Sequence, residues 1–277
     1  METENIENAI KFPPFIVPFA WYFAEQPTAV AIVLPAMGTT ASFYQPFAEE
    51  LAKHGVSVMS PEIPGTGDSL PRPSRGVDYG YRDLIGPYLS ALVSAAKSRV
   101  EGVPVVLVGH SLGAHVGTLA IAAGTAEADA VVTVAGGSVY HGNWQGLSAL
   151  KVRFAGVLFS ALTRLFGCMP GQYVGFGGPQ ARTLIRQWSK IIRNGQYDHI
   201  VDISGYSGNT PMLAIGIRGD TYATEESVTA LAEILRGETT MLDKTWKGSP
   251  HSSWARYPDE TVSRIVEWLN DGSHEIQ

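Results

Sequence analysis

The sequence has a single cysteine, Cys168, so no intramolecular disulfide can form. One thiol is also too few for a structural zinc site built from several thiolates. Basic residues are fewer than acidic ones, 20 Lys and Arg against 26 Asp and Glu, which leaves a net charge of −6. This balance lacks the positive footprint with which proteins bind nucleic acid, so we expect no nucleic-acid partner.

Long hydrophobic runs are also missing. The most apolar stretch, Val152–Phe166, is interrupted by Arg153 and Arg164, and no run reaches the ~18 apolar residues typical of a membrane-spanning helix. The N-terminus is acidic where a secretory signal is basic, and prolines break the apolar stretch from Phe12 to Phe23. We therefore expect no stable membrane insertion, no export by that route and a cytoplasmic location.

The composition that remains is that of a folded globular protein, with 45% hydrophobic residues. Short apolar runs alternate with longer helical patterns, which predicts an α/β fold with a mostly parallel central sheet and helices on both faces. We predict strands at Phe15–Val17, Trp21–Ala24, Ala29–Leu34, Val56–Met59, Val103–Val108, Ala130–Val134, Met212–Ile217 and Thr239–Leu242. We predict helices at Phe43–Lys53, Tyr81–Val100, Leu112–Ala123, Leu147–Phe166, Pro179–Arg193, Glu225–Leu235 and Glu260–Leu269.

One long segment breaks this alternation. From residue 138 to about 207 no strand is predicted, and roughly 70 residues without a strand are too many for a plain connection. The segment predicts a helical cap inserted after the sixth strand, so we divide the chain into a core (residues 1–137 and 208–277) and a cap (residues 138–207). The cap's aromatic side chains either line a substrate pocket or bury against the core, and these roles are compatible. The pocket candidates are Phe159, Phe166 and Trp188 from the cap and His110 from the core.

The clearest chemical motif is Gly109-His110-Ser111-Leu112-Gly113, which lies between a predicted strand and a predicted helix. A serine on a tight strand-to-helix turn needs small residues two positions away on both sides, because the turn brings these positions close to neighbouring elements. The start of a helix also favours negative charge that develops there. The pattern predicts that Ser111 is a nucleophile. The alternative is a serine that only caps the helix.

A serine nucleophile needs a base and an acid. Asp220 directly follows the predicted strand Met212–Ile217, and His251 lies in the loop after the next predicted strand. Ligand sites of open parallel sheets lie at this carboxyl edge. The chain order Ser111, Asp220, His251 is a known order of nucleophile, acid and base, so we predict these three residues as a catalytic triad.

The remaining histidines and acids are weaker candidates. His110 adjoins the serine and cannot curl back to its hydroxyl, and His115 lies inside a predicted helix, so we expect both to be structural. The histidines without a strand-end position are His54, His141, His199 and His274, of which His141 and His199 could line the cap. The alternative acids are Asp198, Asp202, Glu225 and Asp243.

Acyl transfer also requires an oxyanion hole, because negative charge forms on the former carbonyl oxygen. One well-aimed donor contributes about 3–4 kcal/mol. We assign the backbone N–H groups of Leu112, which follows the nucleophile, and of Met37, in the loop after the strand Ala29–Leu34. The alternative is that Ala36–Gly38 form an ordinary turn.

These segments resemble the serine hydrolases of the α/β-hydrolase superfamily over nearly the whole chain outside the cap. The resemblance rests on the segments LPAMG, SFYQPFAEELAKHG, SPEIPGTGDS, VGHSLGAH, IRGD and SPHSSW. The stretch from Pro35 to Ser69 is similar to a group of bacterial predicted hydrolases whose substrates are mostly unassigned. Two positions depart from the superfamily pattern. Pro35-Ala36 replaces a frequent His-Gly, and Glu62 replaces a typical Asp, but neither departure touches the triad.

Two related classes are excluded. Animal lipases share a segment similar to GHSLGAH, but they carry the acid after the preceding strand, where this chain has Gly136, Gly137 and Ser138. Haloalkane dehalogenases and epoxide hydrolases use an aspartate nucleophile, which Ser111 rules out.

The resemblance and the triad imply a serine hydrolase that cleaves a carboxylic ester with a hydrophobic moiety through an acyl-Ser111 intermediate, with a small acyl compound as substrate and no metal or organic cofactor. Thioesterase, lactonase, amidase, C–C hydrolase and acyltransferase activities use the same groups and stay open, as does the oligomeric state. A catalytically silent small-molecule receptor and a membrane-associated enzyme are two hypotheses of a different kind. The membrane-associated enzyme would use the helix around Leu150–Phe166, whose Lys151, Arg153 and Arg164 would meet anionic head groups.

Overall fold

The computed structural model describes residues 8–271, so His274 and the part of the acidic N-terminus before residue 8 lie outside the described residues. The strands are β1 (Ala9–Phe12), β2 (Phe15–Tyr22), β3 (Ala29–Leu34), β4 (Val56–Pro61), β5 (Val105–His110), β6 (Ala130–Val134), β7 (Met212–Ile217) and β8 (Glu238–Leu242). The α-helices are α1 (Gln45–Lys53), α2 (Tyr81–Asp83), α3 (Leu89–Arg99), α4 (Leu112–Ala122), α5 (Gly146–Phe166), α6 (Arg182–Asn194), α7 (Glu225–Ala232), α8 (Pro250–Ser253) and α9 (Asp259–Asn270). Short turns of other helix types are η1 (Ala41–Tyr44), η2 (Leu84–Tyr88), η3 (His141–Asn143) and η4 (Gly171–Tyr173).

The strands form one sheet in the order β1-β2-β4-β3-β5-β6-β7-β8. All pairs from β4 to β8 are parallel, whereas β1 and β2 pair antiparallel with each other and β2 pairs antiparallel with β4. The predicted mostly parallel sheet is confirmed. Because six neighbouring strands run the same way, the loops that follow them meet at one edge of the sheet.

The N-terminal strands differ from the prediction. The sequence predicts two short strands on either side of Pro18, but the structure has one continuous strand, β2, and an additional strand, β1. Pro18 is tolerated because it lies where β2 changes partner: residues up to Pro18 pair with β1, and residues from Phe19 onward pair with β4. A proline at such a changeover removes no N–H from the middle of a continuous ladder.

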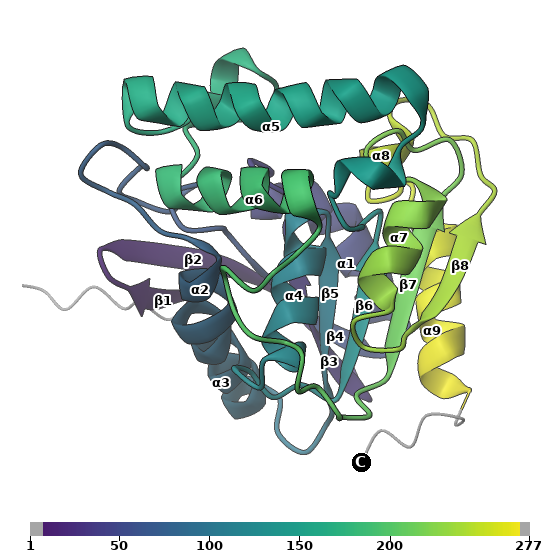
Figure 1. Cartoon of the computed structure of the whole chain (residues 1–277). Helices are drawn as coiled ribbons and strands as arrows, with labels where there is room; N and C mark the ends of the chain where they lie inside the picture. Colours follow the sequence, from purple (N-terminus) through teal and green to yellow (C-terminus); the bar gives the residue numbers. More distant parts are fainter. Residues whose placement is uncertain (1–7, 272–277) are drawn as a thin grey trace, which may run out of the picture.

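The helices cover both faces of the sheet (Figure 1). Alternate side chains of β3 point to opposite faces, as the pleat of a strand requires. Val30, Ile32 and Leu34 join the core beneath α3, α4 and α7, whereas Ala31 and Val33 join the core beneath α1 and α9. The continuously apolar strands are therefore buried on both sides.

The predicted helix Tyr81–Val100 is not regular. It consists of α2, a π-helical turn (η2) and α3, with Gly86 in a non-helical conformation. Pro87 lacks the N–H of a helical hydrogen bond, and its ring crowds the preceding turn, so the helix widens at this point.

The cap lies between β6 and β7, as predicted, and contains α5 and α6, which lie over the edge of the sheet with α5 outermost (Figure 1). The two helices pack closely at Gly156, where a Cβ atom would lie 3.1 Å from Ile192. Asp78 of the core holds the start of α6, because its carboxylate accepts hydrogen bonds from the N–H and hydroxyl of Thr183 and from Arg182. The boundaries of the cap as a separate domain stay a prediction.

The first testable prediction concerns two glycines of α4. A Cβ atom on Gly113 would lie 2.1 Å from the carbonyl oxygen of Leu34, whereas one on Gly117 would meet its nearest neighbours at 3.6 Å, an ordinary contact. We expect Gly113→Ala to lower the free energy of unfolding by about 1–3 kcal/mol because backbone must move. Gly117→Ala should leave it unchanged or raise it by up to about 1 kcal/mol. Denaturant unfolding of both variants measures this, and equal stabilities would contradict the assigned contact.

Candidate active site

Ser111 lies on a strained turn between β5 and α4. Its backbone has φ 51° and ψ −108°, a region that residues other than glycine rarely adopt. The turn is tight, because a Cβ atom on Gly109 would lie 2.5 Å from the N atom of Ala114. Both motif glycines are thus required by close backbone contacts, and the turn holds Ser111 directly before the first residue of α4, at the carboxyl edge of the sheet.

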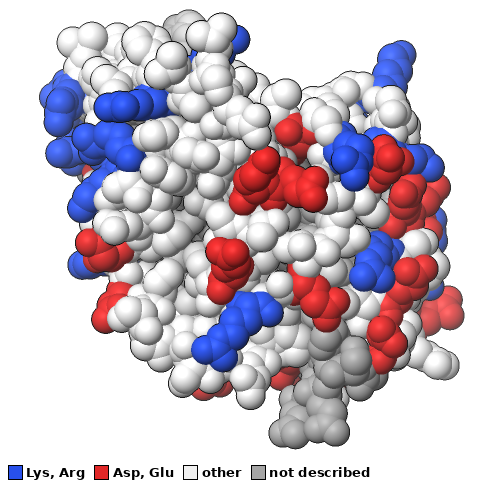
Figure 2. Space-filling model, turned by 45° about the vertical axis from the view of Figure 1, so that its right-hand side comes forward, with Lys and Arg blue, Asp and Glu red and all other residues white. Residues whose placement is uncertain are grey.

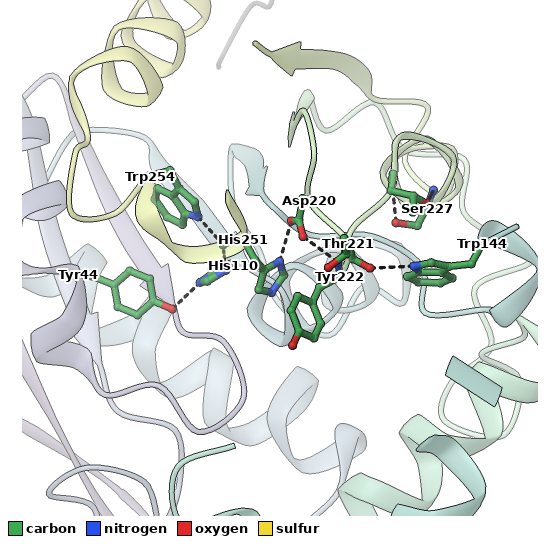
Figure 3. Close-up of polar contacts among 10 residues, drawn as sticks. Tyr44, His110, Trp144, Asp220, Thr221, Tyr222, Ser227, His251 and Trp254 are labelled. Carbon is green, nitrogen blue, oxygen red and sulfur yellow. Dashed lines mark hydrogen bonds and ion pairs between the residues drawn. The ribbon is translucent and has the colours of Figure 1, made fainter. Parts of the chain in front are cut away.

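Asp220 and His251 lie in contact at the same edge. The Nδ1 atom of His251 is 2.8 Å from Oδ2 of Asp220, whose side chain is fully buried, and Figure 3 shows the pair. The other carboxylate oxygen accepts the N–H of Tyr222 at 2.8 Å. Since a carboxylate only accepts hydrogen bonds, His251 donates through Nδ1, which leaves Nε2 as an acceptor.

The sequence predicts a loop at His251, but the residue lies in the short helix α8. This helix starts at Pro250, which suits the first turn of a helix because its missing N–H would have no partner there. A one-turn helix has too few residues for a periodic pattern, so no sequence pattern marks it. The ring of Tyr222 lies against the His251 ring, with centroids 5.1 Å apart.

His110 connects three loops of the site. Its Nδ1 accepts the hydroxyl of Tyr44 at 2.8 Å, and its Nε2–H donates to the carbonyl of His251 at 2.8 Å (Figure 3). Tyr44 in turn accepts the N–H of Ala36 at 2.9 Å, and Trp254 donates a second hydrogen bond to the His251 carbonyl. Burial, followed by the proximity of His251, holds the pKa of His110 well below its usual range. His110 is therefore a neutral bridge behind the site.

Sequence reasoning missed Tyr44 and Trp254. Tyr44 comes from the turn before α1 and Trp254 from the end of α8, and both side chains are completely buried. Their hydrogen bonds join positions far apart in the chain, which local patterns do not reveal. The sequence signals were the presence of Tyr44 in the segment SFYQPFAEELAKHG and of Trp254 in the segment SPHSSW, both of which carry the family resemblance.

The two predicted oxyanion donors belong to adjacent elements. Met37 follows β3, Leu112 begins α4, and no protein hydrogen bond within residues 8–271 uses either backbone N–H. The loop of Met37 also contacts the cap. Gly38 and Gly177 both have positive φ, and a Cβ atom on Gly38 would lie 1.9 Å from the carbonyl oxygen of Phe176. The backbone of cap residues 176–177 is therefore in close contact with the backbone of the predicted oxyanion loop.

Of the four predicted pocket residues, His110 is 2% exposed with both ring nitrogens hydrogen-bonded, and the three residues of the cap separate into two groups. Phe159 is 9% exposed, and its ring stacks on Trp188 and meets Phe176 edge to face. Phe166, in contrast, is 53% exposed at the last residue of α5. The ring cluster of Phe159, Phe176 and Trp188 adjoins the cap loop that contacts Gly38, whereas Phe166 faces outward. We keep Phe159 and Trp188 as pocket candidates and withdraw Phe166, because an exposed helix end does not enclose a ligand.

The start of the cap is tied to the loop that carries Asp220. Trp144 donates from its ring nitrogen to the carbonyl of Thr221 at 2.9 Å (Figure 3), and Thr224 donates to the carbonyl of Asn143 at 2.8 Å. The cap thus contacts both the acid loop and the predicted oxyanion loop, so its position and the geometry of the site are mechanically linked.

The competing histidines and acids take different roles. His115 is buried and bonds Tyr81 and the carbonyl of Gly137, and burial lowers its pKa to about 4. His199 bonds the carbonyl of Gln187. The alternative acids are surface groups: Asp243 pairs with Arg218, Asp198 with His199, Asp202 binds Ser204, and Glu225 is exposed in the first turn of α7. Within residues 8–271, no group of three or more His, Cys, Asp or Glu side chains is arranged to hold a metal ion.

A hollow of about 850 Å³ lies elsewhere on the surface. Gln26 and Gly55, which precede β3 and β4, line it together with residues of α1. It therefore lies near the amino ends of these strands, away from the edge that carries Ser111, Asp220 and His251. We assign it no part in the site.

Glu62 is hydrogen-bonded to η1, the turn that follows the predicted oxyanion loop. It is 5% exposed, and its carboxylate accepts the N–H of Ala41 at 3.1 Å, just before α1. Burial raises the pKa of Glu62 from 4.5 to about 7, and the hydrogen bond from Ala41 only partly opposes this effect. Gly67 is needed beside it, because a Cβ atom there would overlap the carboxylate.

A family model described as the alpha/beta hydrolase family matches residues 31–274 of the chain. No curated protein matches the sequence. Among solved structures, a soluble variant of monoglyceride lipase from Saccharomyces cerevisiae is similar with a TM-score of 0.71 at 11% identity, covering 95% of this chain and 94% of that one. A thermostable carboxyl esterase from Bacillus coagulans has a TM-score of 0.66 at 14% identity, covering 95% and 97%. Est1E from Butyrivibrio proteoclasticus, with ferulic acid bound, has a TM-score of 0.65 at 13% identity, covering 95% and 98%. At these identities the likeness shows the shared fold.

The raised pKa of Glu62 predicts a pH-dependent stability. Between pH 4.5 and about 7 the folded state keeps a proton on Glu62 that the unfolded state has released. The contribution of Glu62 to the free energy of unfolding is therefore fully present below pH 4.5 and is lost as the pH rises through about 7. In Glu62→Gln the contribution is absent, while the amide oxygen still accepts the Ala41 N–H. We expect the stability of the variant relative to wild type to rise across this window by on the order of 3 kcal/mol. Unfolding measured at several pH values tests this, and parallel stability curves would contradict it.

The Tyr44 bridge predicts an asymmetric loss of stability. Tyr44→Phe leaves two buried groups unpaired, the N–H of Ala36 and Nδ1 of His110, so we expect a loss on the order of 2–4 kcal/mol. Tyr88→Phe is a matched control, because Tyr88 is equally buried but its hydroxyl bonds only the carbonyl of Glu62, and its loss should be about 1 kcal/mol. Denaturant unfolding compares the two, and a larger loss in the control would contradict the bridge.

Proposed function

The chain belongs to the alpha/beta hydrolase family, and on that premise we propose that it is a serine hydrolase that cleaves carboxylic esters with a hydrophobic moiety through an acyl-Ser111 intermediate. The observation that carries this proposal is the 2.8 Å contact between Nδ1 of His251 and the buried carboxylate of Asp220. It fixes the ring so that Nε2 is free to accept a proton. The strained turn of Ser111 at the same sheet edge supplies the nucleophile.

In the first step, Oγ of Ser111 attacks the ester carbonyl carbon while Nε2 of His251 takes the hydroxyl proton. The carbonyl π electrons move onto oxygen, and the N–H groups of Met37 and Leu112 donate to that oxyanion. Asp220 stabilises the charged imidazolium. The tetrahedral intermediate then collapses, the C–O bond to the alcohol breaks, and His251 returns its proton to the leaving alkoxide, which leaves acyl-Ser111.

In the second step a water molecule replaces the alcohol. His251 removes a proton from the water, the resulting hydroxide attacks the acyl carbon, and the oxyanion again meets the same two N–H groups. Collapse breaks the bond to Oγ of Ser111, which regains its proton from His251. The carboxylic acid leaves, and each proton that His251 accepts is returned within the cycle, so the chain's own residues suffice for the reaction.

Support for a hydrophobic substrate comes from the ring cluster of Phe159, Phe176 and Trp188, whose loop rests on Gly38 next to Met37. An acyl or alcohol group at these rings would bury apolar surface close to the reacting carbon. The structures to which the chain is similar include a monoglyceride lipase and a carboxyl esterase. Thioesters and lactones present the same carbonyl to the same groups, so the substrate panel includes them.

The proposed roles predict that substitutions in the triad abolish most of the activity, whereas substitution of an exposed acid does not. We expect Ser111→Ala, Asp220→Asn and His251→Ala each to lower kcat/KM for an ester by about 10³-fold or more, since the three residues act as a unit. Asp243→Asn is the control, because Asp243 is an exposed acid paired only with Arg218, and its kcat/KM should stay within about twofold of wild type. Hydrolysis of a series of esters of increasing acyl length measures these values.

Labelling with a fluorophosphonate probe tests whether Ser111 is the nucleophile without requiring knowledge of the substrate. Folded wild-type protein should be modified at the peptide that contains Ser111, while heat-denatured protein and His251→Ala should not react, because the hydroxyl then lacks its base. Near-wild-type turnover by Ser111→Ala on every ester, or labelling of a different serine, would refute the assignment.

A further inference from the structure

Helix α5 presents an apolar face to solvent along its whole length. The residues of this face follow one another at steps that bring them to one side of a helix: Leu147, Leu150, Phe154, Val157, Leu158, Ala161 and Leu165. All seven are exposed, and Phe154 and Leu165 keep about two thirds of their surface, 65% and 68%. The opposite side, with Gly156 and Phe159, is the buried one. A surface helix normally turns its apolar side inward, but these seven side chains are exposed in the structure of residues 8–271.

The cap that carries this face is rich in positive charge. Residues 138–197 contain no Asp or Glu but seven of the 20 Lys and Arg of the chain, whose net charge is −6. These seven are Lys151, Arg153, Arg164, Arg182, Arg186, Lys190 and Arg193. Figure 2 shows one group of Lys and Arg at the upper left, whereas the Lys and Arg at the right lie among Asp and Glu. Among the described residues only Arg182 of the seven forms an ion pair, with Asp78.

The charges on α5 itself flank the apolar face. At 3.6 residues per turn, Lys151 falls on one side of it and Arg153 and Arg164 fall on the other. An apolar stripe between two rows of cations is the pattern of a helix that lies in the plane of a membrane surface, with acyl chains beneath the stripe and phosphate groups beside the cations.

The same helix does not fit a spanning role. Of the described helices, α5 alone is long and apolar enough to cross a membrane by length and composition, a criterion that core helices also meet. Its longest uncharged part inside the flanking cations, Phe154–Thr163, covers only about 15 Å at 1.5 Å per residue, half of the ~30 Å hydrocarbon core. Its inner face also packs against α6 at Gly156.

We propose that the outward face of α5 docks on the surface of an anionic lipid bilayer. Charge complementarity selects this occupant. A second copy of the chain would bring two caps together, and each cap (residues 138–207) holds seven Lys and Arg against two acidic residues, Asp198 and Asp202, so like charge opposes association. A bilayer with anionic head groups supplies both the apolar layer and the negative charge. The docking does not depend on the proposed ester chemistry.

Vesicle binding of the full chain tests this proposal. We expect the protein to co-sediment with phosphatidylcholine vesicles that contain phosphatidylglycerol about tenfold or more tightly than with vesicles of phosphatidylcholine alone, and this preference to weaken as salt rises above ~0.1 M. Ser111→Ala protein should bind equally well without altering the lipid. Loss of turnover in that variant and loss of docking in an α5 variant are therefore separate results.

Two pairs of substitutions locate the contact. Leu150→Gln with Phe154→Gln should reduce binding about tenfold or more, because apolar contact is lost, and Arg153→Gln with Arg164→Gln should abolish most of the preference for phosphatidylglycerol. The matched controls outside the cap are Ile16→Gln with Tyr257→Gln for the apolar pair and Lys97→Gln with Arg264→Gln for the charge pair. Circular dichroism and thermal unfolding verify that each variant folds.

Three results would overturn the proposal. These are absence of binding to phosphatidylglycerol vesicles, equal binding to both vesicle types, and undiminished binding by the two α5 variants. A concentration-dependent dimer, seen by analytical ultracentrifugation and lost in the variant with Leu150→Gln and Phe154→Gln, would assign the face to a second copy instead.

Discussion

The backbone of α4 approaches the end of β3 so closely at Gly113 that no side chain fits between them, and the candidate site depends on this contact. It holds the turn of Ser111 and Leu112 at a fixed separation from the loop that carries Met37. Both N–H groups assigned to the oxyanion therefore rest on elements packed into the core. Donors held in this way need no rearrangement when charge develops, which is the basis of electrostatic preorganisation.

A second set of contacts holds the segment that carries His251 in place. Tyr44 and His110 link the N–H of Ala36 to the carbonyl of His251 through neutral hydrogen bonds in a buried environment. Because burial keeps His110 uncharged, this linkage does not change with protonation across ordinary pH. In the proposed mechanism His251 gains and loses a proton beside Asp220, while this supporting linkage keeps its charge.

The features that the sequence predicted correctly depend on residues close together in the chain, whereas the features that it missed depend mainly on residues far apart. The apolar strands and the glycines around Ser111 are local patterns, and they located the sheet and the serine turn correctly. Asp220 and His251 were found from their positions after strands, and the structure brings them into contact. The interruption at Pro87, the single strand across Pro18 and the helix at His251 depend on tertiary pairing or on a single turn. The outward side of α5 was equally inaccessible, because apolar residues occur on both sides of that helix.

The contact between Gly38 and Gly177 limits how such a protein can diversify. Each glycine occupies a backbone conformation and a space that no other residue suits, and each belongs to a different part of the chain. A cap taken from a relative would bring its own version of the loop at 176–177 and would meet the wrong partner at position 38. A change at position 38 therefore requires a matching change of the cap loop at 176–177, so the two segments are constrained to vary together.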